Sequence, residues 1–247
     1  MNAMLSLLII LALALCPALT GVTEAWDPMP TLEPVETVEP LRLTGVKIGI
    51  DPGHQAHANS DLETVAPGSS EKKAKVSSGT EGVRTRVPEY MVNMDISLLL
   101  RDALEALGAE VYLTHDTVDV DISNQERAIM MNELGVDLVL RLHCDGAESS
   151  SARGIGLYIR ATGENAEECE RAAKALLPAM LAATGARDNG IHKRDTYTGL
   201  NWSTVPSILV EMGFMSNPEE DELLNSPDYQ DKLVAGMVEG ICAYVGR

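Results

Sequence analysis

The stretch Val46-Lys47-Ile48-Gly49-Ile50-Asp51-Pro52-Gly53-His54 decides the fold that this sequence predicts. Residues 46–51 form a short, mostly apolar run of the kind that makes a buried strand, and Pro-Gly ends it at once. The first histidine of the chain follows directly. In an open α/β sheet, functional side chains gather where the strands end. We therefore expect His54 to lie at the carboxyl edge of a sheet.

Two later apolar runs end in the same way. His143 follows the run 136–142, and Glu211 follows the run 206–210. Imidazole nitrogens and carboxylate oxygens can ligate a metal ion or transfer protons. Three distant segments therefore bring side chains of this chemistry to one edge of the predicted sheet.

The rest of the chain alternates between strands and helices. Further strands are predicted over residues 111–114 and 154–160, the second of them at an edge of the sheet. Helices are predicted over residues 89–107, 123–134, 164–184, 218–224 and 229–245. Strands that alternate with helices imply right-handed crossovers and a largely parallel sheet. We expect a single α/β domain with a mostly parallel twisted sheet of about six strands, flanked by helices.

Two segments before residue 44 differ in character from this body. Residues 1–25 contain an apolar stretch that suits a signal peptide or a membrane anchor, with a lipid attached at Cys16 as a third possibility. Residues 26–43 are acidic and rich in proline, which indicates a solvated linker. All three readings of the first segment place residues 44–247 outside the cytoplasm, with the membrane reached only through the N-terminal segment.

Composition excludes some classes of function. The 247-residue chain carries a formal net charge of −18, which argues against binding nucleic acid. Its four cysteines include Cys16, and the remaining three have no CxxC spacing, so a disulfide framework is not expected. We expect a monomer. The long segment 55–88 shows little periodicity and follows His54, so it is predicted to be a loop that rims the site or binds substrate. His115 is expected to be an exposed residue at a strand end.

A catalytic zinc ion is typically held by three protein ligands, with an open position for water. His54 and His143 supply two ligands. Glu89 qualifies as the third, because a helix that follows the first strand can begin over the same edge. Glu211 is then free to act as the general base on the metal-bound water. Cys144 could also coordinate the metal, although adjacent residues on an extended chain point to opposite faces.

These segments resemble the zinc-dependent N-acetylmuramoyl-L-alanine amidases of the third amidase family, which are bacterial cell-wall hydrolases. The matching motifs, in the family order, are Ile48-Gly49-Ile50-Asp51-Pro52-Gly53-His54, Glu89-Tyr90-Met91-Val92-Asn93-Met94, Glu126-Arg127-Ala128, Leu142-His143-Cys144-Asp145-Gly146 and residues 206–218. The resemblance covers about residues 45–247, and the predicted amidase catalytic domain is residues 44–247. It implies that His54, Glu89 and His143 ligate Zn²⁺ and that Glu211 is the catalytic glutamate.

The reaction implied by the resemblance is hydrolysis of the amide between N-acetylmuramic acid and L-alanine in peptidoglycan, the expected partner. Two alternatives stay open, a non-catalytic cell-wall-binding domain and a zinc peptidase or deacylase on the same fold. His192 and Arg194, in a basic loop before the last strand, are candidate contacts for the carboxylates of the stem peptide. Asn93 and Arg127 recur in the family motifs, and we interpret both as structural.

Overall fold

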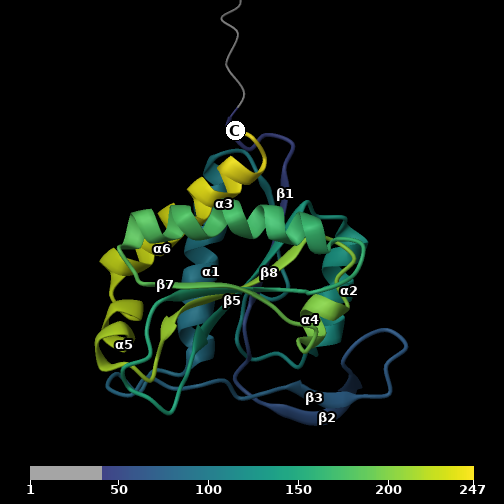
Figure 1. Cartoon of the computed structure of the whole chain (residues 1–247), viewed down its shortest axis with the longest axis horizontal. Coiled ribbons are helices and arrows are strands. Elements are labelled where there is room, and N and C mark those ends of the chain that lie inside the picture. Colours follow the sequence, from purple (N-terminus) through teal and green to yellow (C-terminus); the bar gives the residue numbers. More distant parts are fainter. Residues whose placement is uncertain (1–40) are drawn as a thin grey trace, which may run out of the picture. The chain divides into compact units, whose positions relative to one another are not determined.

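A six-stranded sheet in the order β4-β1-β5-β8-β6-β7 runs through residues 41–247, the part of the chain that the computed structural model describes (Figure 1). Its strands are β1 (Lys47–Pro52), β4 (Glu110–Leu113), β5 (Leu138–Asp145), β6 (Ile155–Ile159), β7 (Asp188–Lys193) and β8 (Ser207–Phe214). The first four strands in this order are parallel. Strand β6 runs antiparallel to β8, and β7 runs parallel to β6. The predicted α/β domain with a mostly parallel sheet of six strands is confirmed.

The prediction that residues 154–160 form an edge strand is wrong. Strand β6 lies between β8 and β7, because residues 188–193, which were expected to belong to a loop, form the edge strand β7. The sequence of β7 gives no alternating apolar pattern, with Ile191 as its one large apolar residue. This segment is therefore a strand because it pairs with β6, and not because its own residues favour the strand conformation.

Helices pack on both faces of the sheet, and each face has its own core. The helices are α1 (Glu89–Ala106), α2 (Asn124–Leu134), α3 (Ala166–Thr184), α4 (Thr198–Asn201), α5 (Pro218–Leu224) and α6 (Pro227–Tyr244). A large apolar core joins one face of the sheet to α1, α3 and α6. A small cluster around Met131 of α2 covers part of the other face. In Figure 1, α3 and α6 cross one side of the sheet, and α2 and α4 lie away from them.

Strand alternation divides the side chains of β5 between these two faces. Leu140, Leu142 and Cys144 belong to the large core. Arg141 and His143, which alternate with them, point to the other face. The face with the small core therefore carries the polar chemistry, and the opposite face supplies most of the apolar burial.

The segment 55–88, predicted to be a loop, contains a β-hairpin. Strands β2 (Asn59–Thr64) and β3 (Lys72–Val76) pair antiparallel as a separate two-stranded sheet. Their side chains are mostly exposed, so the sequence shows no alternation of apolar residues that would predict these strands. Contacts with the body fix the hairpin: the Trp202 indole donates to the Thr64 carbonyl at 2.8 Å, and the Asn124 amide donates to the Lys75 carbonyl at 2.7 Å.

His115 was expected to be exposed, and this prediction is also wrong. The side chain is 8% exposed at the end of β4, with its Nδ1 atom 2.9 Å from the Thr114 hydroxyl. Burial, together with the nearby charge of Arg127, lowers the pKa of His115 to about 4. The imidazole is therefore neutral at neutral pH.

Residues 1–40, which include the predicted signal peptide or anchor and most of the predicted linker, lie outside the described residues. Leu43, at the end of that linker, is fully buried in the large core. Within residues 41–247, no helix is both long enough and apolar enough to cross a bilayer.

Helices α3 and α6 approach each other closely at two glycines of α6. A Cβ atom added to Gly236 would lie 2.6 Å from the Met180 Cα, and one added to Gly240 would lie 2.7 Å from the Leu176 Cα. Real Cβ atoms do not come this close to backbone atoms, so larger residues would push the helices apart.

We predict that Gly236→Ala lowers the free energy of unfolding by about 1–3 kcal/mol, the usual cost of overpacking. In an exposed helix the same change would stabilise by about 1 kcal/mol. Urea unfolding of the variant and of Ala235→Gly, at the exposed neighbouring position, measures both effects. If helix propensity alone determined the change in stability, Gly236→Ala would raise the free energy of unfolding, and that result would contradict the prediction.

Candidate metal centre

The three predicted ligands come together with their donor atoms in an equilateral triangle. The distances are 3.2 Å from His54 Nε2 to Glu89 Oε1, 3.2 Å from His143 Nδ1 to Glu89 Oε1, and 3.2 Å from His143 Nδ1 to His54 Nε2. Tetrahedral ligands with bonds of 2.0–2.1 Å lie about 3.3–3.4 Å apart. The donor set therefore has the chemistry and the spacing that a single zinc ion requires.

Each ligand comes from a different element. His54 follows the end of β1 and has a positive φ of 64°, a backbone conformation that is uncommon outside glycine. Glu89 is the first residue of α1, directly after Pro88. His143 lies in β5, beside β1 in the sheet. Two adjacent parallel strands and one helix start thus meet at the carboxyl edge, as the sequence predicted.

The chain just past β3 orients two of the three ligands. The Ser77 carbonyl lies 2.9 Å from His54 Nδ1 and accepts its proton, which leaves the lone pair of Nε2 free for a metal. The Thr80 N–H donates to Glu89 Oε2 at 2.8 Å. Between them, Gly79 has a φ of 75°, and a Cβ there would lie 2.7 Å from Glu89 Oε2. The hairpin segment therefore belongs to the site, although its sequence gave no motif for this role.

The Glu89 carboxylate is charged. Burial favours its neutral form, but the two neighbouring imidazoles, those of His143 and His54, outweigh burial and hold the pKa of Glu89 well below its ordinary value. Its Oε1 atom also accepts the Cys144 N–H at 3.0 Å and the Asn93 amide at 3.2 Å. A fixed, buried negative charge between two imidazoles suits a divalent cation.

Cys144 does not join this donor set. Its thiol points into the large core, where it lies 3.5 Å from Asn93 Oδ1. Burial raises the pKa of the Cys144 thiol well above its ordinary value. The strand alternation that argued against coordination by Cys144 therefore holds in the structure.

Glu211 stands beside the triangle on the neighbouring strand. It is the register partner of His143 in the β5–β8 pairing, and with both histidines it lines a cavity of about 220 Å³. Its Oε2 atom is buried and has no hydrogen-bond partner among residues 41–247. Burial, with the charges of Glu89 and Asp145, raises the pKa of Glu211 well above its ordinary range. An orphaned acceptor with a raised pKa is suited to take a proton from a molecule in the cavity.

A buried ion network holds the turn that carries His54. The Arg127 guanidinium, 1% exposed, donates to the carbonyls of Pro52 at 2.7 Å and His54 at 3.0 Å. Asp51 lies between two arginines, 3.1 Å from Arg127 and 2.9 Å from Arg141. The interpretation of Arg127 as structural is therefore confirmed. Arg141 was missed, although its place two residues before His143 puts it on the same strand face.

The two predicted substrate contacts lie apart from the triangle. His192 is in β7, where its Nε2 atom lies 2.7 Å from the Asn189 carbonyl and its ring stacks on Tyr158 at 4.8 Å. Neither His192 nor Arg194 is among the residues that line the cavity with Glu211. Tyr197, which the sequence analysis did not single out, does line it.

Comparison with known proteins gives a consistent result. The family model described as N-acetylmuramoyl-L-alanine amidase matches residues 48–243. An N-acetylmuramoyl-L-alanine amidase of Mycobacterium tuberculosis is 29% identical over 83% of this chain and 89% of its own length. The amidase LytC of Bacillus subtilis is also 29% identical, over 82% of this chain but 36% of its own length. The crystal structure of the amidase Ami1 from Mycobacterium smegmatis superposes with a TM-score of 0.73 at 28% identity, covering 83% of this chain and 98% of that chain.

The ion network generates a prediction about stability and pH. Burial raises the pKa of Asp51, but Arg141, Arg127 and the Thr114 hydroxyl outweigh it and hold the pKa well below the ordinary value of 3.8. A carboxyl group whose pKa is lowered by folding contributes stability above its unfolded pKa and loses it as the pH falls further.

We predict that Asp51→Asn lowers the free energy of unfolding by about 3–5 kcal/mol at pH 7, because two buried arginines lose their counterion. The difference from the wild type should shrink below about pH 4. Urea unfolding at pH 7 and pH 3 measures it. Asp61→Asn is the control, because Asp61 forms an exposed pair with Lys75 at 3.5 Å. An equal cost at both pH values would contradict the argument.

Proposed function

Because the chain belongs to the third family of N-acetylmuramoyl-L-alanine amidases, we propose that it hydrolyses the amide between N-acetylmuramic acid and L-alanine with a zinc ion and a glutamate base. Hydrolysis of peptidoglycan amides is the activity of the family. The ion, its ligands and the base are our assignments. The observation that carries them is the triangle of donor atoms beside a buried carboxyl oxygen that has no partner.

We assign His54, Glu89 and His143 as the zinc ligands. Two imidazoles and one carboxylate are a donor set that hydrolytic zinc sites use. When bound, the ion polarises the scissile carbonyl and lowers the pKa of water. The contact from the Ser77 carbonyl fixes the His54 tautomer that such a site needs, and the contact from the Thr80 N–H fixes the Glu89 carboxylate.

Glu211 acts first as the general base and then as the general acid. Its Oε2 atom accepts a proton from the attacking water while the water oxygen bonds to the carbonyl carbon. The carbon–nitrogen bond then breaks, and Glu211 returns the proton to the leaving amine of L-alanine. A raised pKa makes the ionised Glu211 a stronger proton acceptor than an ordinary carboxylate, which suits the first step.

The remaining assignments concern substrate and location. His192 and Arg194 stay proposed contacts on the β7 side, with Tyr158 stacked against His192. The peptidoglycan substrate and the apolar N-terminal segment both suit a domain that acts outside the cytoplasm. We propose that it acts there as a monomer.

We predict that His54→Ala, Glu89→Ala and His143→Ala each lose bound zinc, whereas Glu211→Gln keeps it and loses turnover by roughly 10²–10⁴-fold. Elemental analysis of the purified variants measures the zinc. Cys144→Ala is the matched control beside His143 and should keep its zinc, because the thiol faces the core. Loss of zinc in Cys144→Ala would place the thiol among the ligands, and full turnover in Glu211→Gln would remove Glu211 from the mechanism.

We predict that the wild type releases free L-alanine amino termini from intact sacculi and from isolated muropeptides, and that zinc chelation stops this release. Labelling of new amino groups, followed by mass spectrometry of the products, identifies the bond. Cleavage inside the peptide would instead favour a zinc peptidase. Zinc binding without turnover would favour a non-catalytic wall-binding domain.

A further inference from the structure

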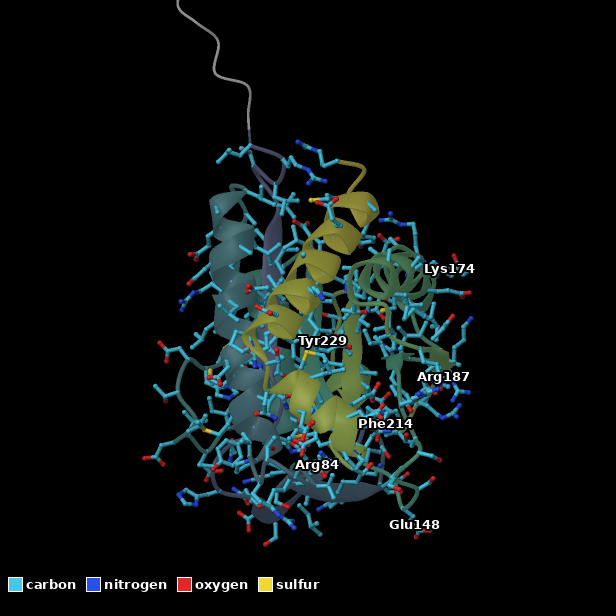
Figure 2. All side chains as sticks on the ribbon, turned by 90° about the vertical axis from the view of Figure 1, so that its left-hand side faces the viewer. Arg84, Glu148, Lys174, Arg187, Phe214 and Tyr229 are labelled. Carbon is cyan, nitrogen blue, oxygen red and sulfur yellow. The ribbon has the colours of Figure 1, made fainter. Side chains whose placement is uncertain are left out.

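Three arginines line one hollow beside α5, in a chain whose formal net charge is −18. Arg84, Arg153 and Arg187 come from three separate segments, and Ser150, Ser151 and Glu219 lie among them. We call this site the arginine hollow. Figure 2 shows Arg84 and Arg187 on the same side of the molecule, on either side of Phe214 at the end of β8.

The direction of β6 and β7 places two of these arginines. Both strands run opposite to β8, so they begin at the edge where the parallel strands end. Arg153 lies just before β6, and Arg187 directly precedes β7. The backbone holds them together, because the Ile155 N–H donates to the Arg187 carbonyl at 2.9 Å. The reversal of strand direction thus brings positive charge to the carboxyl edge.

The guanidinium groups of the arginine hollow outnumber the carboxylates that pair with them. Arg84 pairs with Glu222 at 2.8 Å, but within residues 41–247 no carboxylate lies within 4.0 Å of the guanidinium of Arg153 or Arg187. Among the lining residues, Glu219 carries the one carboxylate. Guanidinium groups and serine hydroxyls are the donors that bind oxyanions.

The cleft at the metal centre has the opposite character. It is lined by four carboxylates, those of Glu89, Asp145, Glu148 and Glu211. Asp145 and Glu148, the two of these residues that have no part in the proposed ion binding or proton transfer, would repel a free carboxylate of the substrate. An acidic portion of the substrate therefore needs a site outside this cleft.

The arginine hollow begins close to the cleft. Gly156 of β6 is the register partner of Glu211, and Arg153 lies three residues before it, or about 10 Å along an extended chain. Ser216 lines the cleft, and the next residue, Asn217, lines the arginine hollow. An extended peptide covers about 10 Å in three residues.

We propose that the arginine hollow binds carboxylates of the stem peptide, about three residues beyond the amide that is cleaved. This inference rests on the proposed function, because it takes the scissile amide to lie between the metal centre and Glu211. Arg153 and Arg187 supply the charge-assisted hydrogen bonds, and Arg84 adds to them from the far side of the hollow. The site makes the enzyme selective for stem peptides with free carboxylates.

The test compares two substrates. One is a muramyl tetrapeptide with free carboxylates, and the other is the same compound with those carboxylates converted to primary amides. In the zinc-loaded Arg153→Gln/Arg187→Gln variant, KM for the first substrate should rise roughly tenfold with kcat unchanged. KM for the amidated substrate should be the same in the variant and the wild type. Both side chains are exposed, so the fold should tolerate the change.

Two further variants sharpen the result. Arg101→Gln/Lys174→Gln removes the same charge elsewhere on the surface and should leave both KM values unchanged. Arg194→Gln tests the β7 side, and a selective rise in KM for Arg194→Gln with no rise for the Arg153→Gln/Arg187→Gln variant would overturn the proposal. Equal effects on both substrates, or no effect of the double variant in the arginine hollow, would overturn it as well.

A binding measurement separates this inference from the proposed function. Calorimetry with the zinc-loaded Glu211→Gln protein and the muramyl tetrapeptide needs no turnover. The affinity should fall roughly tenfold when Arg153→Gln and Arg187→Gln are added. If the wild type does not cleave the amide but this loss of affinity is found, the proposed reaction fails and the carboxylate site stands. If the wild type cleaves and the affinity is unchanged, the carboxylate site fails alone.

Discussion

The site depends on one buried carboxylate, Asp51, which is held between Arg127 and Arg141. Asp51 is the residue before the last of β1, and the same Arg127 that pairs with it also donates to the carbonyls of Pro52 and His54. The strained backbone at His54 persists because these contacts over-determine it. A buried ion pair of this kind contributes little net stability over an apolar replacement. Its value here is geometric, since it fixes the direction in which the first histidine leaves the sheet.

Because side chains alternate along the strands, the polar groups of the site and most of the apolar core lie on opposite faces of the sheet. The face of β5 that carries Leu140 and Leu142 packs into the large core, and the face that carries Arg141 and His143 stays polar. A one-residue shift in register would exchange the two faces and bury the charges in the large core. The sheet can therefore hold a cluster of polar groups on one face because the other face supplies most of the apolar burial.

A feature of the structure could be predicted where neighbouring residues in the sequence determine it, and not where residues distant in the chain do. The strands before His54, His143 and Glu211 could be read from apolar runs, although β5 continues past His143 to Asp145 and β8 continues past Glu211 to Phe214. The meeting of these strands at one edge follows from parallel pairing. The edge strand β7 and the hairpin β2–β3 left no pattern, because non-local pairing and hydrogen bonds from Trp202 and Asn124 create them. The sequence predicted that segment 55–88 rims the site, but it did not predict the contact of the Ser77 carbonyl with His54. A contact made by a backbone carbonyl does not depend on the type of residue, so the sequence gives no signal for it.

The antiparallel pair β6–β7 changes what the carboxyl edge of this sheet can do. In a fully parallel sheet, every strand would bring its last residues to this edge. Here two strands bring the residues that precede them, and Arg153 and Arg187 are among those. Under the proposed function, this edge has an acidic end, where Glu89 would ligate the ion and Glu211 would accept the water proton, and a basic end beside α5. A substrate with an amide at one end and carboxylates at the other has a single orientation in which both ends are matched, so strand direction alone can set the polarity of binding.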